Sequence, residues 1–497
     1  MIYTAFLPNY YSTLIKAQQQ SIIIDNLYFF VADGVTKDAV ANDSPKTVKD
    51  EQVTINQILY GAKLMPSNLI PMCRKIPWQY GKIFTQYSST DPNLNVKDFF
   101  CVNSNGAVYK CLDNNGNSPS LEQPTTLIPG AFKQSDGYTW IYLFKVSENE
   151  MLNYSYEDLM PLIVDPNVTS ATQRGTISTI DVETPGNYKE YHNGYVQGIV
   201  SNNMVRIEDS ASKHTGAYNS MGFYIQSGPG QGEIKQISNY VSNSSGNYVT
   251  LSTNLDTAGL GSQYDIAPYV KISGNGSGGS ARSILTGEAV TKIEILNRGA
   301  EYTLANAELL ANTVYSTPGT VNVNLSPPKG HGGDIYQELY INDVLINIEF
   351  DNYIIENLPT DEITFSKVGF IRGILDENTL TLYNEPTFNN TFTASIPTVD
   401  SQFEVGDIIR PFNAPAPLAQ IVYANTTHVI GVYQTPFLRY TLGMTLVNQN
   451  NVQGTVIDIT QPQVKFIGTD VVCQVNTNTV QRDENSRELF IILNKIR

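Results

Sequence analysis

From about residue 170 to residue 325 the chain is built of short runs rich in β-branched and aromatic residues, separated by glycine, serine and asparagine. Examples are "GFYIQS", "NYVTLS" and "YDIAPYVKIS". Such runs are too short for amphipathic helices, whereas β-branched and aromatic residues between turn residues are typical of antiparallel strands. This long central part is therefore expected to be all-β, which limits its fold to packed or curled sheets.

A single strand is expected in "SDGYTWIYLFKVS", residues 135–147, after the turn signal Asp136-Gly137. One face of this strand is aromatic throughout: Tyr138, Trp140, Tyr142 and Phe144. The other face carries Ile141 and Leu143. Because both faces are apolar, we expect the strand to be central in its sheet. The four aromatic residues, together with Trp78, are the predicted structural core.

The first 165 residues are expected to mix helix and strand. Apolar residues recur every three or four positions before Pro66: Ile55, Ile58, Leu59, Ala62 and Met65. This spacing predicts a helix that begins at the N-cap Ser44 and ends before Pro66. Nearer the start, "YYSTLIKAQQQ" predicts a shorter helix and "SIIIDNLYFFVA" a buried strand.

Two pairs of segments resemble one another. "IDVETPGNY" (180–188) and "IEILNRGAEY" (293–302) each combine an alternating strand, a glycine turn and a tyrosine, so they are expected to bracket one module. "FEVGDII" (403–409) and "YTLGMTL" (440–446) predict paired β-elements around Gly406 and Gly443.

The predicted fold is mainly β, of the α+β class, with several β-sandwich-like sheets and a small mixed α/β N-terminal part. Three domains are expected at this chain length. They are an N-terminal mixed domain (1–165), an inserted all-β module (166–325) and a C-terminal β domain (326–497).

Charge excludes one class of partner. The chain has 47 acidic against 31 basic residues, a net charge of −16, which disfavours binding to nucleic-acid phosphates. Only 16% of residues are charged, and a surface of short amides and hydroxyls favours a protein held within an assembly. No apolar run is long enough to span a bilayer, and "MIYTAFLPNYY" lacks the basic start of a secretory signal. Folding in a cytoplasm is therefore expected.

The motifs that could carry chemistry are weak. The glycine-rich "SGPGQGEIKQI" and "SGNGSGGSARS" are predicted to be hairpin turns, because no helix follows them to complete a phosphate site. The cysteines show no metal or redox spacing and are expected to be buried free thiols: Cys73, Cys101, Cys111 and Cys473.

One histidine and two acids remain as site candidates. His331 in "SPPKGHGGD" could pair with Asp334, although a structured connector over 326–334 is the favoured interpretation. Glu349 and Asp351 could form a glycosidase pair but are better interpreted as solvated turn residues. We expect no catalytic residues, no cofactor, no metal and no small-molecule substrate.

Several segments, taken in order, resemble one protein family. They are "MIYTAFLPNYYSTLIKAQQQ", "GAKLMPSNLIPMCRKIPW", "AVYKCLDNNGNSPSLEQP" followed by "SDGYTWIYLFKVS", "SPPKGHGGD", "ITFSKVGFIRGIL" and "DENSRELFIILNKI". The family is the baseplate wedge subunit of the protein 8 type, from T-even-like contractile-tailed phages and cyanophages. The resemblance covers residues 1–150 well and 326–497 in patches, and the glycine-rich region 170–325 departs from it.

The resemblance implies a non-enzymatic structural protein of the virion tail, assembled in the host cytoplasm. Family members are homodimers that link the inner scaffold of the wedge to peripheral baseplate proteins and move when the baseplate rearranges on infection. The alternative is a host receptor- or glycan-binding tail protein. A row of exposed aromatic residues would favour it: Tyr224, Tyr240, Tyr264 and Tyr269. A third hypothesis, a polysaccharide-cleaving enzyme, would use Glu349 or Asp351.

Overall fold

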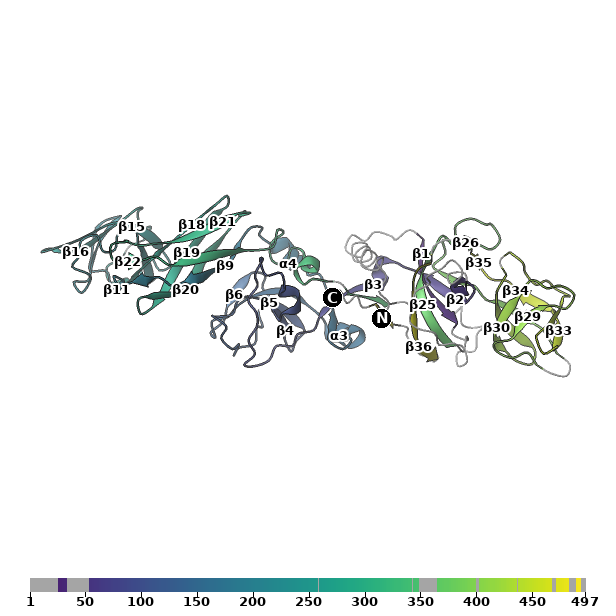
Figure 1. The fold of residues 1–497 in the computed structure, drawn as a ribbon. Helices are drawn as coiled ribbons and strands as arrows, with labels where there is room; N and C mark the ends of the chain where they lie inside the picture. Colours follow the sequence, from purple (N-terminus) through teal and green to yellow (C-terminus); the bar gives the residue numbers. More distant parts are fainter. Residues whose placement is uncertain are drawn as a thin grey trace. The chain divides into compact units, whose positions relative to one another are not determined.

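In the computed structural model most of the regular secondary structure is β-strand, with a few short helices (Figure 1). It describes residues 26–33, 53–257, 259–341, 343–347, 364–398, 402–435, 437–466, 471–481 and 489–492. Several separate sheets, two of which curl into half-barrels, confirm the mainly-β, multi-domain fold predicted from the sequence.

The chain forms two compact units. Unit 1 combines residues 1–72 with 342–497, and unit 2 contains residues 73–341. The chain thus leaves unit 1 once and returns to it once. The three-part division at 165/166 and 325/326 stays a prediction, but it did not anticipate that both ends of the chain share unit 1.

The main sheet of unit 1 explains why the two ends belong together. Its strand order is β27 (Thr387–Asn389), β2 (Ile58–Lys63), β1 (Leu27–Asp33), β25 (Thr364–Arg372) and β36 (Val471–Gln481). The β1 residues from position 27 to position 32 are all buried, as expected for the apolar run "LYFFVA". A strand that is apolar on both faces needs neighbours on both sides, and here they come from opposite ends of the sequence.

The helix predicted to end before Pro66 is wrong over its last turns, because Ile58–Lys63 is strand β2. A helix would bury one face only, whereas Ile58 to Ala62 are all buried and pair with β1 on one side and β27 on the other. This pairing outweighs the local periodicity. Within the described part of the predicted helix, residues 53–55 are helical, and Ser44 and the helix expected over 10–20 lie outside the described residues.

The second sheet of unit 1 has seven strands whose two end strands follow each other in the chain, so it curls into a half-barrel. In spatial order they are β33 (Gln453–Thr455), β32 (Thr445–Val447), β29 (Ile408–Pro411), β30 (Ala419–Ala424), β31 (His428–Tyr433), β28 (Phe392–Ser395) and β34 (Asp458–Thr460). Gly406 and Gly443 have φ of 92° and 81°, in the region that favours glycine. The strands that follow them, β29 and β32, pair with each other, which confirms the predicted pairing.

The remaining elements of unit 1 are short. They are β3 (Leu69–Arg74), β24 (Asp343–Asn347), β37 (Leu489–Ile492), β26 (Leu375–Asp376), β35 (Val464–Lys465) and the 3-10 helix η1 (Pro66–Asn68). β24 pairs with β3 on one side and with β37 on the other.

Unit 2 begins with a four-stranded sheet in the order β4 (Phe100–Val102), β5 (Ala107–Asp113), β7 (Thr139–Lys145) and β6 (Ala131–Lys133). β7 is internal to this sheet, and its residues 139–144 are all buried, as its two apolar faces predict. The turn before it uses Gly137 at φ 87°.

The aromatic residues around β7 form the core of this sheet. Trp140 is fully buried, stacks on Tyr138 with 5.4 Å between ring centroids and meets the ring of Phe84 edge-on at 5.3 Å. Tyr142 and Phe144 are also buried. Trp78 differs, because it is only half-buried, and its indole Nε1–H donates to the Ser120 hydroxyl at 3.0 Å.

The central region of unit 2 has its own hydrophobic core, built from residues between Ile177 and Ala311. Its seven-stranded sheet also curls on itself, because the end strands are consecutive: β11 (His192–Tyr195), β17 (Gln263–Ala267), β14 (Gly222–Ser227), β15 (Ile234–Asn243), β16 (Gly246–Leu251), β13 (Met204–Ile207) and β12 (Gly198–Ser201). The strands that follow in the sequence form a four-stranded sheet in the order β20 (Ala289–Ala300), β19 (Ser277–Thr286), β18 (Tyr269–Gly274) and β21 (Ala305–Leu310).

Both glycine-rich loops of this region are turns between paired strands, as predicted: one joins β14 to β15 and the other joins β18 to β19.

The two ends of this central module lie side by side. β9 (Ile177–Thr184) pairs with β23 (Thr320–Leu325), and the Ser326 backbone N–H donates to the Thr176 carbonyl at 2.8 Å. The short pair β10 (Asn187–Tyr188) and β22 (Ser316–Thr317) lies near the same ends. The module therefore begins and ends at adjacent positions.

The similar segments 180–188 and 293–302 contribute to one core. Their tyrosines, Tyr188 and Tyr302, are both buried in it. Each tyrosine hydroxyl accepts a backbone N–H, from Gly319 at 2.7 Å and from Gly279 at 3.3 Å. The two segments thus play equivalent roles within the module they were expected to bracket.

Trp140→Ala is expected to destabilise unit 2 by about 3–5 kcal/mol, because it removes a fully buried indole and leaves a cavity. Both tryptophans of the chain lie in unit 2, so the fluorescence of the remaining Trp78 reports its unfolding in urea. Val96→Ala, at a 70% exposed position of the same unit, is the control and should change little. An unchanged urea midpoint for Trp140→Ala would contradict the core assignment.

Candidate functional site: a buried charged cluster and an open cleft

Unit 2 contains a fully buried ion pair between Lys110 and Glu338. Lys110 projects from β5, and Glu338 lies at the end of the short helix α5 (Ile335–Glu338). The Lys110 ammonium contacts Glu338 Oε2 directly, and the two side chains are only 0% and 1% exposed. A buried pair of this kind is favourable only if its remaining hydrogen-bonding capacity is met.

The surroundings of the pair meet part of that need. The Gly332 backbone N–H donates to Glu338 Oε1 at 2.6 Å. The Lys110 ammonium lies 4.6 Å from the centroid of the Tyr87 ring, a cation–π contact. The carboxylate and the ammonium thus each have a second partner besides one another.

His331 completes what we call the charged cluster: Lys110, Ser178, His331 and Glu338. Its Nε2 lies 2.7 Å from the Ser178 hydroxyl oxygen on β9, and its Nδ1 lies 3.9 Å from Glu338 Oε2, too long for a hydrogen bond. The carboxylate beside His331 is therefore Glu338. The pairing considered from the sequence, with Asp334, is not formed.

Asp334 instead organises the start of α5. Its carboxylate accepts the backbone N–H of Gln337 at 3.2 Å, as an N-cap residue does, and forms an ion pair with Lys329 at 2.8 Å. The segment 326–334 is thus a structured connector, which is how it was interpreted from the sequence.

Burial dominates the electrostatics of the cluster. Burial, followed by the charge of Lys110, lowers the pKa of His331 to about 3, so the imidazole is neutral at pH 7. Burial also lowers the pKa of Lys110 below its ordinary value. For Glu338 burial is the largest single influence and raises the pKa, but the interactions with Lys110 and His331 together outweigh it, so the net pKa is lowered.

Ser178, His331 and Glu338 follow the order of a hydrolytic triad, but they cannot work as one. Ser178 is 1% exposed, so no substrate reaches its hydroxyl. A histidine with a pKa of about 3 is also a weak general base at neutral pH. What the cluster does is join β5, β9, the connector and α5 in the interior of unit 2.

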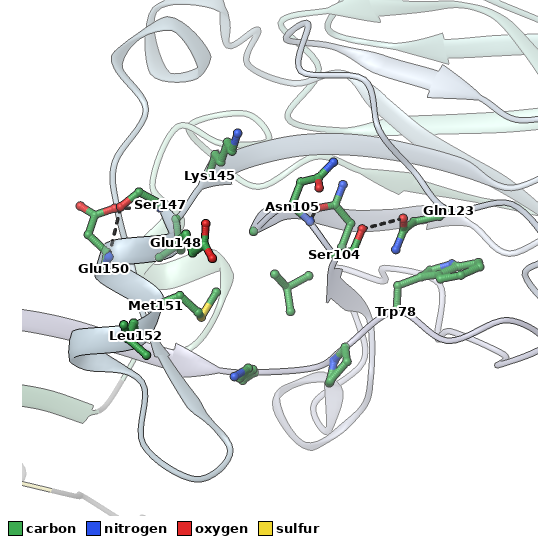
Figure 2. Close-up of a pocket in the computed structure, with 16 residues that line it drawn as sticks. Trp78, Ser104, Asn105, Gln123, Lys145, Ser147, Glu148, Glu150, Met151 and Leu152 are labelled. Carbon is green, nitrogen blue, oxygen red and sulfur yellow. Dashed lines mark hydrogen bonds between the residues drawn. The ribbon is translucent and has the colours of Figure 1, made fainter.

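A separate feature of unit 2 is an open cleft of about 1120 Å³ (Figure 2). It lies between the β4–β5 turn with Ser104 and Asn105, the helix α3 (Glu148–Tyr154) and Trp78. Ser147 and Glu150 cap the start of helix α3 with reciprocal hydrogen bonds, so the helix is well ordered at this end. Leu152 on the same helix is 82% exposed. A cleft with an aromatic wall and an exposed leucine suits contact with another protein surface more than binding of a small molecule.

Other residues singled out from the sequence have different fates. Tyr240 and Tyr264 are fully buried in the module core, so the row of exposed aromatic residues is not formed. Cys73, Cys101 and Cys111 are buried and free, as predicted. Glu349 and Asp351 lie outside the described residues. Within the described part of the chain no group of three or more metal-ligating side chains comes together, and no helix is long and apolar enough to cross a membrane.

Sequence reasoning missed Lys110 and Glu338, which stand 228 positions apart. The one signal available was Lys110 itself, a lysine inside the apolar strand "AVYKCL". A lysine there must be paired if its strand is central, but the partner cannot be identified without the tertiary contact.

Comparison with known protein families and with curated proteins gives no match for this chain.

Lys110→Met is expected to destabilise unit 2 by about 3–5 kcal/mol, because it leaves the Glu338 carboxylate buried without its counter-charge. The double variant Lys110→Met/Glu338→Leu should be more stable than Lys110→Met alone, since it removes that orphan charge. Urea unfolding followed by tryptophan fluorescence compares the two. A double variant no more stable than the single one would show that charge compensation does not hold this cluster together.

The charged cluster also predicts acid sensitivity. Because the pKa of His331 is lowered to about 3, the unfolded chain binds a proton below about pH 6.5 that folded unit 2 does not bind. This contribution to stability is present above pH 6.5 and is lost as the pH falls toward 3, at up to about 1.4 kcal/mol per pH unit. His331→Gln should flatten the loss between pH 6.5 and 4.5.

His214→Gln is the matched control for this slope, because His214 is exposed and lies in the same unit. Urea midpoints of unit 2, measured at several pH values, give the slopes to compare. The same slope in His331→Gln as in the unaltered chain would refute the assignment to His331.

Proposed function

We propose that this chain is a structural component of a phage tail baseplate wedge. In this role it links the inner wedge scaffold to peripheral baseplate proteins, contributes to virion assembly and takes part in the baseplate rearrangement on infection. Its partners are other wedge proteins and a second copy of itself.

The observation that carries the proposal concerns the segments that resemble the family. The segments 107–124, 135–147 and 326–334 are far apart in the sequence, yet they pack together in unit 2. β5 and β7 from the first two are neighbours in one sheet. His331 from the third lies 5.1 Å, ring to ring, from Tyr87 beside that sheet. Chance similarities would be scattered, whereas an inherited fold keeps such segments in contact.

The region that departs from the family supports the same interpretation. Residues 177–325 have their own core within unit 2, and the chain enters and leaves this module at adjacent positions, Thr176 and Ser326. An insertion of this kind adds a domain to an existing fold without changing the fold around it. The family resemblance on either side of the insertion is therefore expected to persist.

The surface of unit 2 is suited to assembly. Tyr80 is 74% and Leu121 is 51% exposed. Their loops are joined by backbone hydrogen bonds, from Gly81 N–H to the Ser120 carbonyl at 2.8 Å and from Ser120 N–H to the Lys82 carbonyl at 2.9 Å. Exposed apolar side chains held on ordered loops are typical of surfaces that another protein covers.

Quantitative mass spectrometry of purified particles from the source organism tests this proposal. The copy number of the chain, measured against a hub or sheath standard, should be a multiple of about six, because wedges are expected in sixfold arrangement around the hub. The purified chain should sediment at twice its mass of 55.0 kDa. Absence from particles, or about three copies per fibre, would reject the wedge function and favour receptor or glycan binding.

A further inference from the structure

We propose that the side chains of Lys110 and Glu338 condense to an amide bond, so that unit 2 carries an internal covalent cross-link between β5 and α5. The site is the charged cluster, of which the sequence motifs indicated His331 but neither Lys110 nor Glu338. The inference goes beyond the proposed function and does not depend on it.

The first requirement for such a bond is a permanent, dry contact between amine and carboxyl group. Lys110 Nζ touches Glu338 Oε2, with the two side chains 0% and 1% exposed. The Tyr87 ring covers the ammonium at 4.6 Å. Holding the two groups together replaces a bimolecular encounter by an intramolecular one, and exclusion of water protects the product from hydrolysis.

The second requirement is a neutral amine, since only the lone pair of Nζ can attack a carboxyl carbon. Burial lowers the pKa of Lys110, which makes loss of its proton easier than in water. The acceptor is in place, because Glu338 Oε2 is in contact with Nζ. The lowered pKa of Glu338 makes the ion pair the main form, and a proton that passes from Nζ to Oε2 gives the minor, reactive form, an amine beside a carboxylic acid.

The third requirement is stabilisation of the oxyanion that forms when Nζ adds to Glu338 Cδ. The Gly332 backbone N–H already donates to Oε1 at 2.6 Å, so the oxygen that gains charge has a donor before the reaction begins. Fixed backbone donors of this kind are the usual elements of oxyanion holes.

The last requirement is a route for the second proton. His331 does not supply this route, because its Nδ1 lies 3.9 Å from Oε2, beyond hydrogen-bond distance, and its lowered pKa makes it a weak base. In the adduct Nζ and Oε2 are both bonded to Cδ, and the second proton passes from Nζ to Oε2 directly. The Nζ–Cδ bond forms, the Cδ–Oε2 bond breaks, and Oε2 leaves as water with two of the three ammonium protons.

The cross-link would close a loop that contains the whole inserted module. Its ends, residues 110 and 338, are 228 positions apart. A covalent closure of this length restricts the unfolded chain and keeps the connector on β5 when the module is pulled. The structure assigns this bond to the point where the insertion is attached.

Intact-mass spectrometry of the full-length protein, unfolded in acid after purification, tests the inference. The chain should be lighter than its sequence mass by one water molecule, and a protease digest should contain one branched peptide that joins Lys110 to Glu338. A full sequence mass for the folded protein would overturn the proposal. So would a water loss that maps to any other residue pair.

Two variants separate the chemistry from folding. Lys110→Arg keeps the positive charge beside Glu338 but offers no amine that can be acylated, so it should have its full sequence mass. Glu338→Gln lacks the carboxylate oxygen that accepts the Nζ proton, so it should also keep its full sequence mass. A branched peptide in either folded variant would contradict the proposed condensation.

Discussion

The contact between Lys110 and Glu338 is the interaction on which the architecture of unit 2 depends. It lies where β5 of the first sheet meets the connector that leads back from the inserted module. Two charges in a dry interior are costly when either is alone, so the position of one determines the position of the other. Gly332, Tyr87 and His331 are arranged around this pair, and Ser178 extends the network to β9.

The same constraint clarifies how a large insertion is tolerated. The module has a separate core and adjacent ends, so it need not share apolar contacts with the sheet that carries it. Polar contacts connect the two instead: Lys133 with Glu294 at 2.7 Å, and Lys292 with Asp113 at 2.9 Å. Because these pairs are partly exposed, each adds little to stability. The buried pair of Lys110 and Glu338 is therefore expected to hold the connector in place more strongly than these exposed pairs do.

Particular residues show how far sequence reasoning reached. The alternation around Trp140 correctly predicted an internal strand, because only a strand covered on both sides is apolar on both faces. The glycines at 406 and 443 correctly predicted paired elements, since their backbone conformation is local. The spacing of Ile55, Ile58 and Leu59 led to the wrong prediction of a helix, because a strand that is buried on both faces can show the same apolar spacing as one face of a helix. Trp78 was predicted to be a core residue but is half-buried beside the cleft, because the local sequence does not distinguish partial from full burial.

The sequence by itself determined the mainly-β class, the glycine turns and the all-β character of residues 170–325, since these follow from side-chain shape and glycine over a few neighbouring positions. Only the tertiary structure decided that the two ends of the chain share one unit and that Lys110 meets Glu338. Strand pairing and burial of charge join residues hundreds of positions apart. The identity of such a partner depends on which surfaces exclude water together, and no local pattern of residues records that.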